Sequence, residues 1–416
     1  YKGEHYQEIK DLLGGDYFVS TANQNSSTAM MVEGDKVAKN AYNAYRDGLV
    51  NWIGSFGQME YTGDKWSTFI NVSGIINSYK GIDYFQKREL DLGDTILQIG
   101  ANDTINYNGE EYTSNSSGLT NVQTDWKTIP GFTFKSGASY AVNDHSNVFM
   151  NIGYLSRTPQ FSNVIDNNTN TFFKEIVNEK ILALEGGYNL ARKAFGINLN
   201  GYLTNWKNKP FPYGVSVPDP QDPTETIRIN INGMDAIHIG GEFDLAWKIN
   251  KIFSTELMFS YGDWFWNSSK TVFIPQYDSL EISFDAKGVH VGDAAQTALS
   301  AALRIQPLKQ LYFKVQYQFF DRYYANFDPF SLQGENGGRE SWMIPSYSML
   351  NLFAGYRYKF KSFVLFCNGN ITNMLNNIFI TDARNNYNDP FNFDAQSANV
   401  MFGQGFRFNV SLGIQF

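Results

Sequence analysis

Cysteine is almost absent from this sequence, since Cys367 is the only one among 416 residues. No intrachain disulfide can form, and metal or redox clusters built from several thiolates are excluded. Histidine is also scarce: His5, His145, His238 and His290 show no metal-ligand spacing such as H-E-x-x-H. No nucleophile motif is visible either. We therefore expect no metal site, no cofactor and no enzymatic activity.

Long apolar runs and an excess of basic charge are missing as well. No uncharged apolar run reaches about 18 residues, which excludes a transmembrane helix. The net charge is −8, which argues against nucleic acid as a partner. Aromatic residues, in contrast, make up 16% of the chain, and mean hydropathy is only −0.35. A membrane protein that is polar on average is what a β-barrel predicts, because every second residue faces a wet lumen.

Alternation of apolar and polar residues is the dominant pattern. Ile239, Phe243 and Leu245 share one face of a segment, whereas Glu242 and Asp244 share the other. In several segments the polar face carries Gln, Asn, Glu and Lys, which suits a water-filled lumen rather than the dry core of a soluble sandwich. We assign the apolar face to lipid and the polar face to the lumen.

Such segments recur about 14 times and have the even length that a bilayer demands. Short turns alternate with long polar stretches, which is typical of outer-membrane barrels with short periplasmic turns and long extracellular loops. We predict an all-β fold in which residues 1–416 form one transmembrane antiparallel β-barrel domain. The predicted strands are 1–10, 46–62, 65–80, 126–142, 145–158, 177–191, 193–207, 236–248, 252–267, 294–306, 309–324, 345–359, 361–373 and 400–416. The predicted short turns are Gly63-Asp64, Asn143-Asp144, Arg192, Asn250-Lys251, Pro307-Leu308 and Phe360-Lys361.

The end of the chain gives the sharpest local signal. Phe408, Leu412, Ile414 and the terminal Phe416 lie on one face of an alternating segment. A last amphipathic strand with a terminal aromatic residue resembles the signal read by the barrel-assembly machinery of bacterial outer membranes. An ordinary edge strand is the alternative, although an open apolar edge invites aggregation.

Several segments from about residue 150 onwards are weakly specific alone but informative in their common order and spacing. They are Gly153–Phe161, Asn178–Lys180, Leu184–Tyr188, Asn232–Asp235, Gly240–Glu242, Gly288–Thr297, Asp321–Phe327, Asn370–Asn377 and Asp382-Ala383. Together they resemble the barrel of TonB-dependent outer-membrane receptors, particularly those of Bacteroidetes-type bacteria, and indicate the C-terminal part of such a barrel.

The resemblance implies a barrel of about 22 strands that encloses a plug. It further implies integral, multi-pass insertion in outer-membrane lipid and energy delivered through TonB to an N-terminal region that is not in this chain. The substrate would be a scarce or bulky nutrient, namely a ferric chelate, haem, a glycan or a peptide, and a surface lipoprotein is an additional partner to consider. Two alternatives stay open at this stage: a passive diffusion porin of roughly 14–16 strands, and a structural or adhesive surface barrel.

The long loops are the candidate binding regions, since function concentrates on loops carried by a rigid scaffold. The aromatic residues there can stack on flat ligands, although an aromatic girdle at the membrane boundary explains some of them equally well. The candidate ligand-binding residues are Tyr323, Tyr324, Phe327, Phe330, Trp342, Trp264 and Trp266. Loop 81–125 is acidic and suits either solubility or attraction of cations. We expect His238 to be a solvated lumen residue and Cys367 to face lipid.

Overall fold

The computed structural model describes most of the chain from Arg46 onwards. The described residues are 46–83, 87–100, 103–119, 123–166, 170–173, 176–209, 215–218, 226–229, 233–273, 281–385 and 395–416. The chain divides into two compact units, each treated by itself below. The first unit comprises Tyr1–Phe56, Ser73–Phe132 and Ser156–Asn178, and the second comprises Gly57–Val72, Thr133–Leu155 and Glu179–Phe416.

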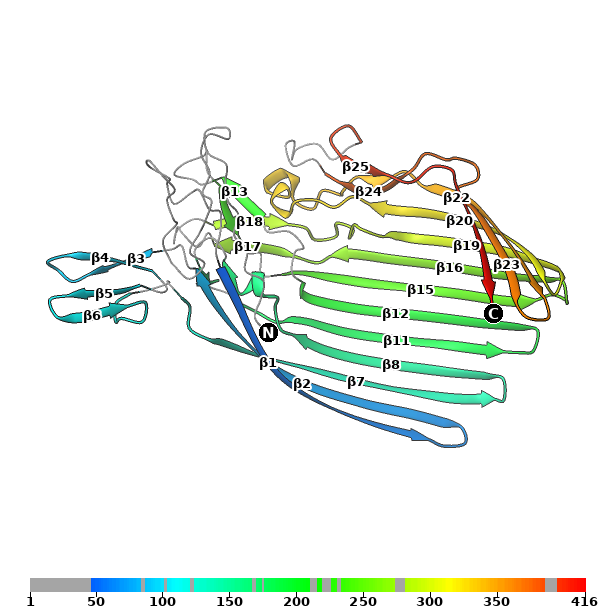
Figure 1. Cartoon of the computed structure of the whole chain (residues 1–416), viewed down its shortest axis with the longest axis horizontal. Coiled ribbons are helices and arrows are strands. Elements are labelled where there is room, and N and C mark those ends of the chain that lie inside the picture. The colour runs from blue at the N-terminus through cyan, green and yellow to red at the C-terminus, as the bar shows by residue number, and fades with distance from the viewer. Residues whose placement is uncertain are drawn as a thin grey trace. The chain divides into compact units, whose positions relative to one another are not determined.

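The main feature is one 14-stranded sheet in which successive long strands are hydrogen-bonded neighbours (Figure 1). The order is β1-β2-β7-β8-β11-β12-β15-β16-β19-β20-β22-β23-β26, and the short β21 pairs with β20 at the side. Every pairing with a printed register is antiparallel, as meandering connections require. The bounds are β1 Arg46–Thr62, β2 Trp66–Asp83, β7 Lys127–Asn143, β8 Ser146–Arg157, β11 Glu179–Ala191, β12 Phe195–Lys209, β15 Met234–Lys248, β16 Phe253–Trp266, β19 Ala295–Leu308, β20 Leu311–Tyr324, β21 Met343–Ile344, β22 Tyr347–Lys359, β23 Val364–Thr372 and β26 Arg407–Gln415.

The antiparallel all-β prediction is confirmed, and all but one of the predicted long strands lie close to their expected places. The exception, 1–10, lies outside the described residues. The last strand is predicted too long at its start. The segment 400–416 is divided, because Asn399–Phe402 forms β25 in a separate hairpin and only Arg407–Gln415 joins the large sheet. Between the two pieces, Gly403 donates its N–H to the carbonyl of Phe379 instead of continuing a strand pair.

Short turns join the strands at one end of the sheet. The N–H groups of Gly63, Arg192 and Phe360 donate across their turns to Trp66, Phe195 and Phe363. One predicted turn, Pro307-Leu308, is wrong, because β19 continues through Leu308 and the turn falls at 309–310. The register shifts between Ile305 and Leu308, and this irregularity accommodates a proline that has no N–H to give to the ladder.

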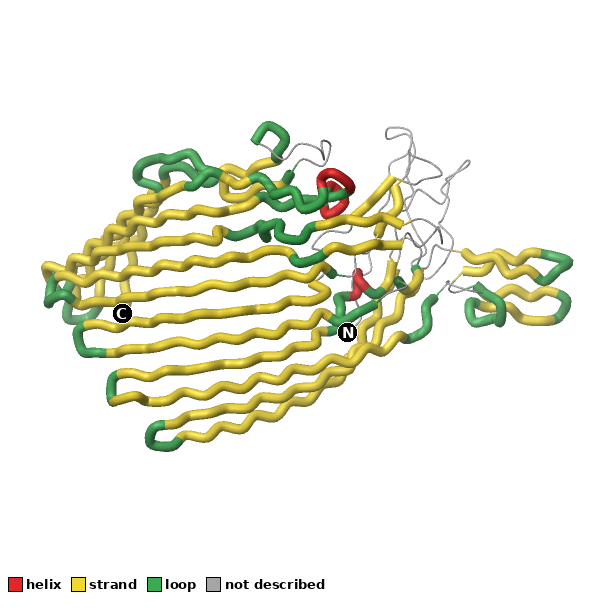
Figure 2. Tube along the Cα trace, turned by 180° about the vertical axis from the view of Figure 1, so that it is seen from behind, coloured by secondary structure: helices red, strands yellow, loops and turns green. Residues whose placement is uncertain are grey.

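The opposite end carries the long connections, which contain more order than expected (Figure 2). Several fold back as hairpins instead of remaining plain polar loops. These are β3 Lys87–Asp91 with β4 Ile96–Gly100, β5 Thr104–Tyr107 with β6 Glu110–Thr113, β9 Ile165–Asp166 with β10 Thr171–Phe172, β13 Val215–Pro218 with β14 Thr226–Ile229, β17 Ser269–Phe273 with β18 Glu281–Asp285, and β24 Ile380–Arg384 with β25. The described helices are the short 3₁₀ turns η3 Phe161–Asn163, η4 Pro329–Ser331 and η5 Gly334–Asn336. None of the described helices has the length and apolarity needed to cross a membrane.

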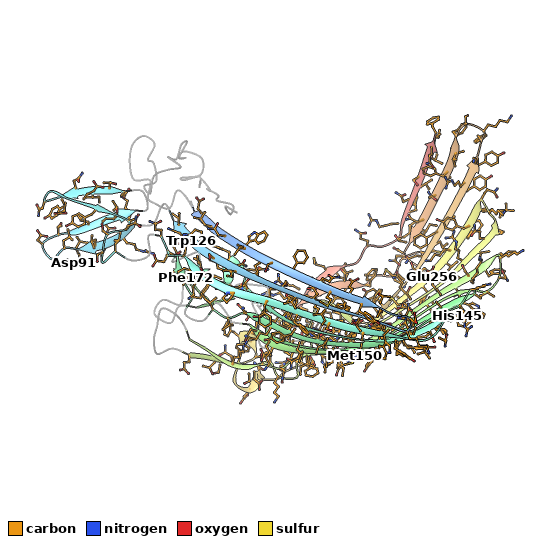
Figure 3. The ribbon with its side chains drawn as sticks, turned by 90° about the horizontal axis from the view of Figure 1, so that it is seen from below. Asp91, Trp126, His145, Met150, Phe172 and Glu256 are labelled. Carbon is orange, nitrogen blue, oxygen red and sulfur yellow. The ribbon has the colours of Figure 1, made fainter. Side chains whose placement is uncertain are left out.

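The register of β12, β15 and β16 establishes two different faces. Phe243 lies between Leu199 and Phe259, whereas Glu242 lies between Asn200 and Ser260. The predicted separation of Ile239, Phe243 and Leu245 from Glu242 and Asp244 is therefore confirmed by strand pairing. Side chains project from both sides of the sheet (Figure 3). The apolar side is uncovered, since Leu199 is 47% and Phe259 41% exposed. A sheet with such a face needs a nonpolar environment.

Aromatic rings on the polar face lie against glycines of the next strand. A Cβ atom added to Gly187 would come within 2.6 Å of the ring of Phe149, and one added to Gly240 would come within 2.5 Å of the hydroxyl of Tyr202. Larger side chains at these glycines would displace the rings. Aromatic residues that cover glycines in this way pin strand register and allow the sheet to curve. Similar pairs are Phe69 over Gly137, Tyr312 over Gly355 and Phe366 over Gly413.

Candidate functional site

The polar face of the second unit consists of hydrogen-bonded side chains from neighbouring strands. Lys314 forms an ion pair of 2.7 Å with Glu256, which is labelled in Figure 3. Gln316 donates to Ser300 over 3.2 Å, and Asn351 donates to Gln318 over 2.9 Å. Two open hollows of about 460 Å³ each lie on this face. Groups that pair with one another but remain open to water suit the wall of a hydrated passage.

Near the loop end of this face, β12, β15 and β16 bring together four ring side chains that we name the indole cluster: Tyr202, Trp206, His238 and Trp264. The centroid of the His238 ring lies 6.0 Å from Trp206 and 5.6 Å from Trp264, with tilts of 51° and 44°. The indole N–H of Trp264 donates to the hydroxyl of Tyr202 over 2.9 Å. The rings form a half-buried aromatic surface, and Trp206 and Trp264 also pack against the buried residues around Trp266.

Two charged residues complete the edge of the indole cluster. The ammonium of Lys209 lies 4.7 Å from the ring centroid of Trp206 and 5.2 Å from that of Trp266. The indole N–H of Trp206 donates over 2.5 Å to the carboxylate of Glu179. Glu179 itself is buried, so this edge presents a lysine ammonium held against aromatic faces, which suits a polar ligand better than a hydrocarbon.

His238 does not have the environment that the sequence indicated. It lies on the polar face as expected, but it is half-buried between two indoles, and its Nδ1 atom is buried without a hydrogen-bond partner. The prediction of a solvated side chain is wrong. Alternation identified the face, but it could not show that Trp206 and Trp264 from the two neighbouring strands would cover the ring.

Three of the predicted ligand-binding aromatics instead belong to a hydrophobic core between loops and the ends of β15 and β16. Trp266 is 4% and Phe327 2% exposed, and both pack in a cluster with Phe284 and Val291. Phe330 borders this cluster and meets Phe284 edge-on at 5.8 Å. This core fixes the loops 281–291 and 325–332 to the ends of β15 and β16. A ligand role for these three residues stays a prediction.

The other four predicted aromatics lie in three environments. Tyr323 and Trp342 pack in a second loop core with Ile344, and Tyr323 is 9% exposed. Tyr324 is 8% exposed and stacks on His290 with ring centroids 4.2 Å apart and an angle of 3°. Trp264 is thus the one candidate that lies in the indole cluster. Sequence reasoning missed Tyr202 and Trp206, although their even-numbered positions on a polar face were a usable signal.

Two carboxyl groups at the loop end, those of Asp328 and Asp382, have raised pKa values. Burial raises the pKa of Asp328, although its side chain accepts a hydrogen bond of 3.0 Å from the N–H of Phe330. Burial also raises the pKa of Asp382, and the neighbouring carboxylate of Asp293 raises that pKa further. Both groups resist ionisation because their charged forms lose hydration.

The acidic stretch 81–125 is partly engaged in internal contacts. Asp103 forms an ion pair of 3.1 Å with Lys87, and Glu89 accepts from Gln98 over 2.7 Å. Attraction of cations to this stretch stays a prediction. Among the residues that the structure describes, no group of three or more His, Cys, Asp or Glu side chains is placed to hold a metal ion.

No protein-family model and no curated protein matches this chain. Solved structures, in contrast, match nearly its whole length. The siderophore receptor PiuA from Acinetobacter baumannii aligns with a TM-score of 0.58 at 12% identity, over 90% of this chain and 44% of its own. The copper transporter OprC aligns with a TM-score of 0.58 at 11% identity, over 90% of this chain and 49% of its own.

The FrpB iron transporter from Neisseria meningitidis gives a TM-score of 0.55 at 11% identity, over 89% of this chain and 46% of its own. The chain has the β-barrel fold of these receptors. It spans about half the length of each, between 44% and 49%. In this receptor-barrel fold, the indole cluster and the loop cores lie at the end with the long connections.

Proposed function

We propose that this chain forms part of the barrel wall of a bacterial outer-membrane receptor that takes up a scarce or bulky nutrient with energy delivered through TonB. The observation that carries the proposal is the two-faced sheet in a receptor-barrel fold. One face is apolar and uncovered, as contact with lipid requires, and the other is polar and lined by paired side chains. In this proposal the protein is an integral outer-membrane protein, and the C-terminal part of a barrel of the Bacteroidetes type.

The indole cluster is the proposed ligand contact within the wall. Its rings supply an aromatic surface, and Lys209 supplies a positive charge at the edge. A ferric chelate, haem, a glycan or a peptide each presents planar or ring-shaped groups with polar substituents, which such a surface can hold. The solved structures with this fold include receptors for a siderophore and a transporter for copper, and this supports uptake of a scarce nutrient by this chain.

Uptake by cells that express the complete gene product tests the proposal. We expect accumulation of one labelled member of a panel of ferric chelates, haem, glycans and peptides. Accumulation should stop when TonB is deleted or the proton-motive force is collapsed. The purified protein in a planar bilayer should show no steady conductance. Steady conductance together with TonB-independent uptake would instead establish the passive porin of roughly 14–16 strands.

Two substitutions on the same strand locate the ligand. Trp264→Ala removes a ring from the indole cluster, and we expect the apparent affinity to fall about tenfold, as for an aromatic contact worth more than about 1 kcal/mol. Phe259→Ala removes a ring from the apolar face of β16 and should leave the affinity unchanged. Equal effects of both variants on affinity would place the ligand elsewhere.

A further inference from the structure

His290 lies between two carboxylates at the loop end of the second unit. Its Nδ1 atom is 2.5 Å from Oε2 of Glu340, and its Nε2 atom is 3.3 Å from Oδ1 of Asp263. The ring stacks on Tyr324, and the backbone of His290 forms an isolated β-bridge with Phe265. One imidazole thereby joins the loop after β18 to the wall and to the loop before β21.

The hydrogen bonds of Glu340 determine which nitrogen of a neutral ring carries the proton. Oε1 of Glu340 accepts from the backbone N–H of His290 over 3.0 Å and from that of Ser341 over 2.9 Å. This carboxylate can therefore act only as an acceptor toward Nδ1, which must be protonated. In the neutral ring, Nε2 then carries a lone pair and no proton, and it faces an oxygen of Asp263.

The charge state of the His290 ring decides whether its contact with Asp263 is attractive or repulsive. The Oδ1 atom of Asp263 accepts from Arg322 over 2.8 Å, and Arg322 also donates to the carbonyl of Gly262 and covers the ring of Tyr261 at 4.7 Å. Only the doubly protonated imidazolium donates to both carboxylates. In the neutral imidazole, the lone pair on Nε2 faces the carboxylate oxygen of Asp263, and the two repel each other. Lys287 and Asp293 are the nearest charged residues in sequence on the same loop, and Asp293 accepts from Asn326.

We propose that His290, Asp263 and Glu340 form a pH-sensitive latch that holds the outer loops 286–294 and 325–342 to the barrel wall. The latch is closed when His290 is protonated and loosens as the pH rises and the ring loses its second proton, because the contact with Asp263 then becomes repulsive. Histidine is the side chain that usually titrates in the range in which bacterial surroundings vary, roughly pH 5–8. The loops concerned carry Val291 and Phe327 of the loop core, so loosening the latch exposes that core. This regulation goes beyond the uptake role, and its test does not depend on a substrate.

Hydrogen–deuterium exchange of the complete protein in detergent tests the latch, with times corrected for the intrinsic effect of pH on exchange. In the wild type we expect peptides from 286–294 and 325–342 to exchange about fivefold faster at about pH 8 than at about pH 5.5. His290→Gln keeps a donor for Glu340 but cannot become charged, so the ratio should fall to about one. His145→Gln, at the short-turn end, is the matched control and should keep the wild-type ratio.

Asp263→Asn tests the latch by changing the partner of His290 instead of His290 itself. The introduced amide can donate to Nε2 of the neutral ring and still accept from Arg322, so the loops should stay protected at both pH values. A wild-type ratio below about twofold, or a ratio that survives in both the His290 and the Asp263 variants, overturns the latch. If His290→Gln fails to assemble, the Asp263→Asn result alone decides, since slow exchange at the higher pH supports the latch and fast exchange refutes it.

Discussion

The wall of the sheet and its loop end are held together in different ways. In the wall, the position of a residue in the alternation determines its face, and Phe243 and Glu242 lie on opposite faces although they are neighbours. At the loop end, residues distant in sequence enclose small cores, such as Trp266 with Phe284 and Phe327. The wall depends on its surroundings for stability, whereas the loop end buries its own apolar groups.

In the first unit, as at the loop end of the second, residues distant in sequence enclose a small core. Tyr79 is 2% exposed and packs with Val164 and Ile165. Its hydroxyl donates to the carbonyl of Pro159 over 2.7 Å, and Asn77 donates to Thr158 over 2.6 Å. The segment Gly153–Phe161, which resembles receptor barrels, thus includes residues that attach a loop to strand ends. In this chain, the segment therefore attaches a loop as well as forming part of a strand.

The largest expected effect concerns the loop core. Phe327→Ala should destabilise the folded loops by about 3–5 kcal/mol, because it removes a fully buried ring. Local exchange of 325–342 should rise strongly while the strands of the wall keep their protection. Leu199→Ala, on the exposed apolar face, is the comparison and should leave exchange of the loops unchanged. A loss of protection throughout the sheet would show that the loop core and the wall are one cooperative unit.

A charge on the apolar face should have the next largest effect. Phe243→Arg should destabilise the barrel by about 2–4 kcal/mol if that face contacts lipid. Glu242→Arg, one residue away, should leave folding nearly unchanged because its side chain faces water. Reversible folding into lipid vesicles measures both, or assembly yield does where folding is irreversible. Similar penalties at the two positions would remove the distinction between the faces.

The last strand gives a third test of the wall. Phe408, Leu412 and Phe416 are 73%, 74% and 97% exposed, and the ring of Phe416 lies 6.4 Å from that of Phe363, so deletion of Phe416 removes little internal packing. We nevertheless expect less protein in the outer membrane, because the predicted assembly signal loses its terminal ring. Heat-modifiable mobility on gels measures the assembled fraction. If the deletion variant reached the outer membrane at normal levels, Phe416 would not be an assembly signal, and the last strand would serve only to pair with β23.

The smallest expected effect is electrostatic and belongs to the loop end. Burial raises the pKa of Asp328, so its protonated form favours the folded loop. That stability is fully present below the carboxyl's ordinary pKa and is lost as the pH rises through the raised value. Asp328→Asn keeps the acceptor for the N–H of Phe330 and removes the charge. The variant's loop should be slightly more stable than wild type at neutral pH and equal at low pH, as local exchange would show.

The sequence by itself determined the wall. The period of two fixed the faces of Ile239 and Glu242, and most of the strand bounds and turns followed, because a one-residue slip would reverse every side chain. Cys367 likewise lies on the apolar face, as expected, because its partners on the two neighbouring strands are Tyr356 and Leu412. Contact of that face with lipid stays a prediction.

Only the tertiary structure decided the loop end. Nothing local in the sequence places His290 between Asp263 and Glu340, or His238 between Trp206 and Trp264. These contacts join residues that lie 27 to 50 positions apart or on different strands. Alternation is a local property that each strand expresses separately, whereas the loop cores and the latch depend on where neighbouring strands end and how their connections fold back. Aromatic residues therefore had the same signature in the sequence whether they belong to a buried core, as Phe327 does, or to the half-buried indole cluster, as Trp264 does.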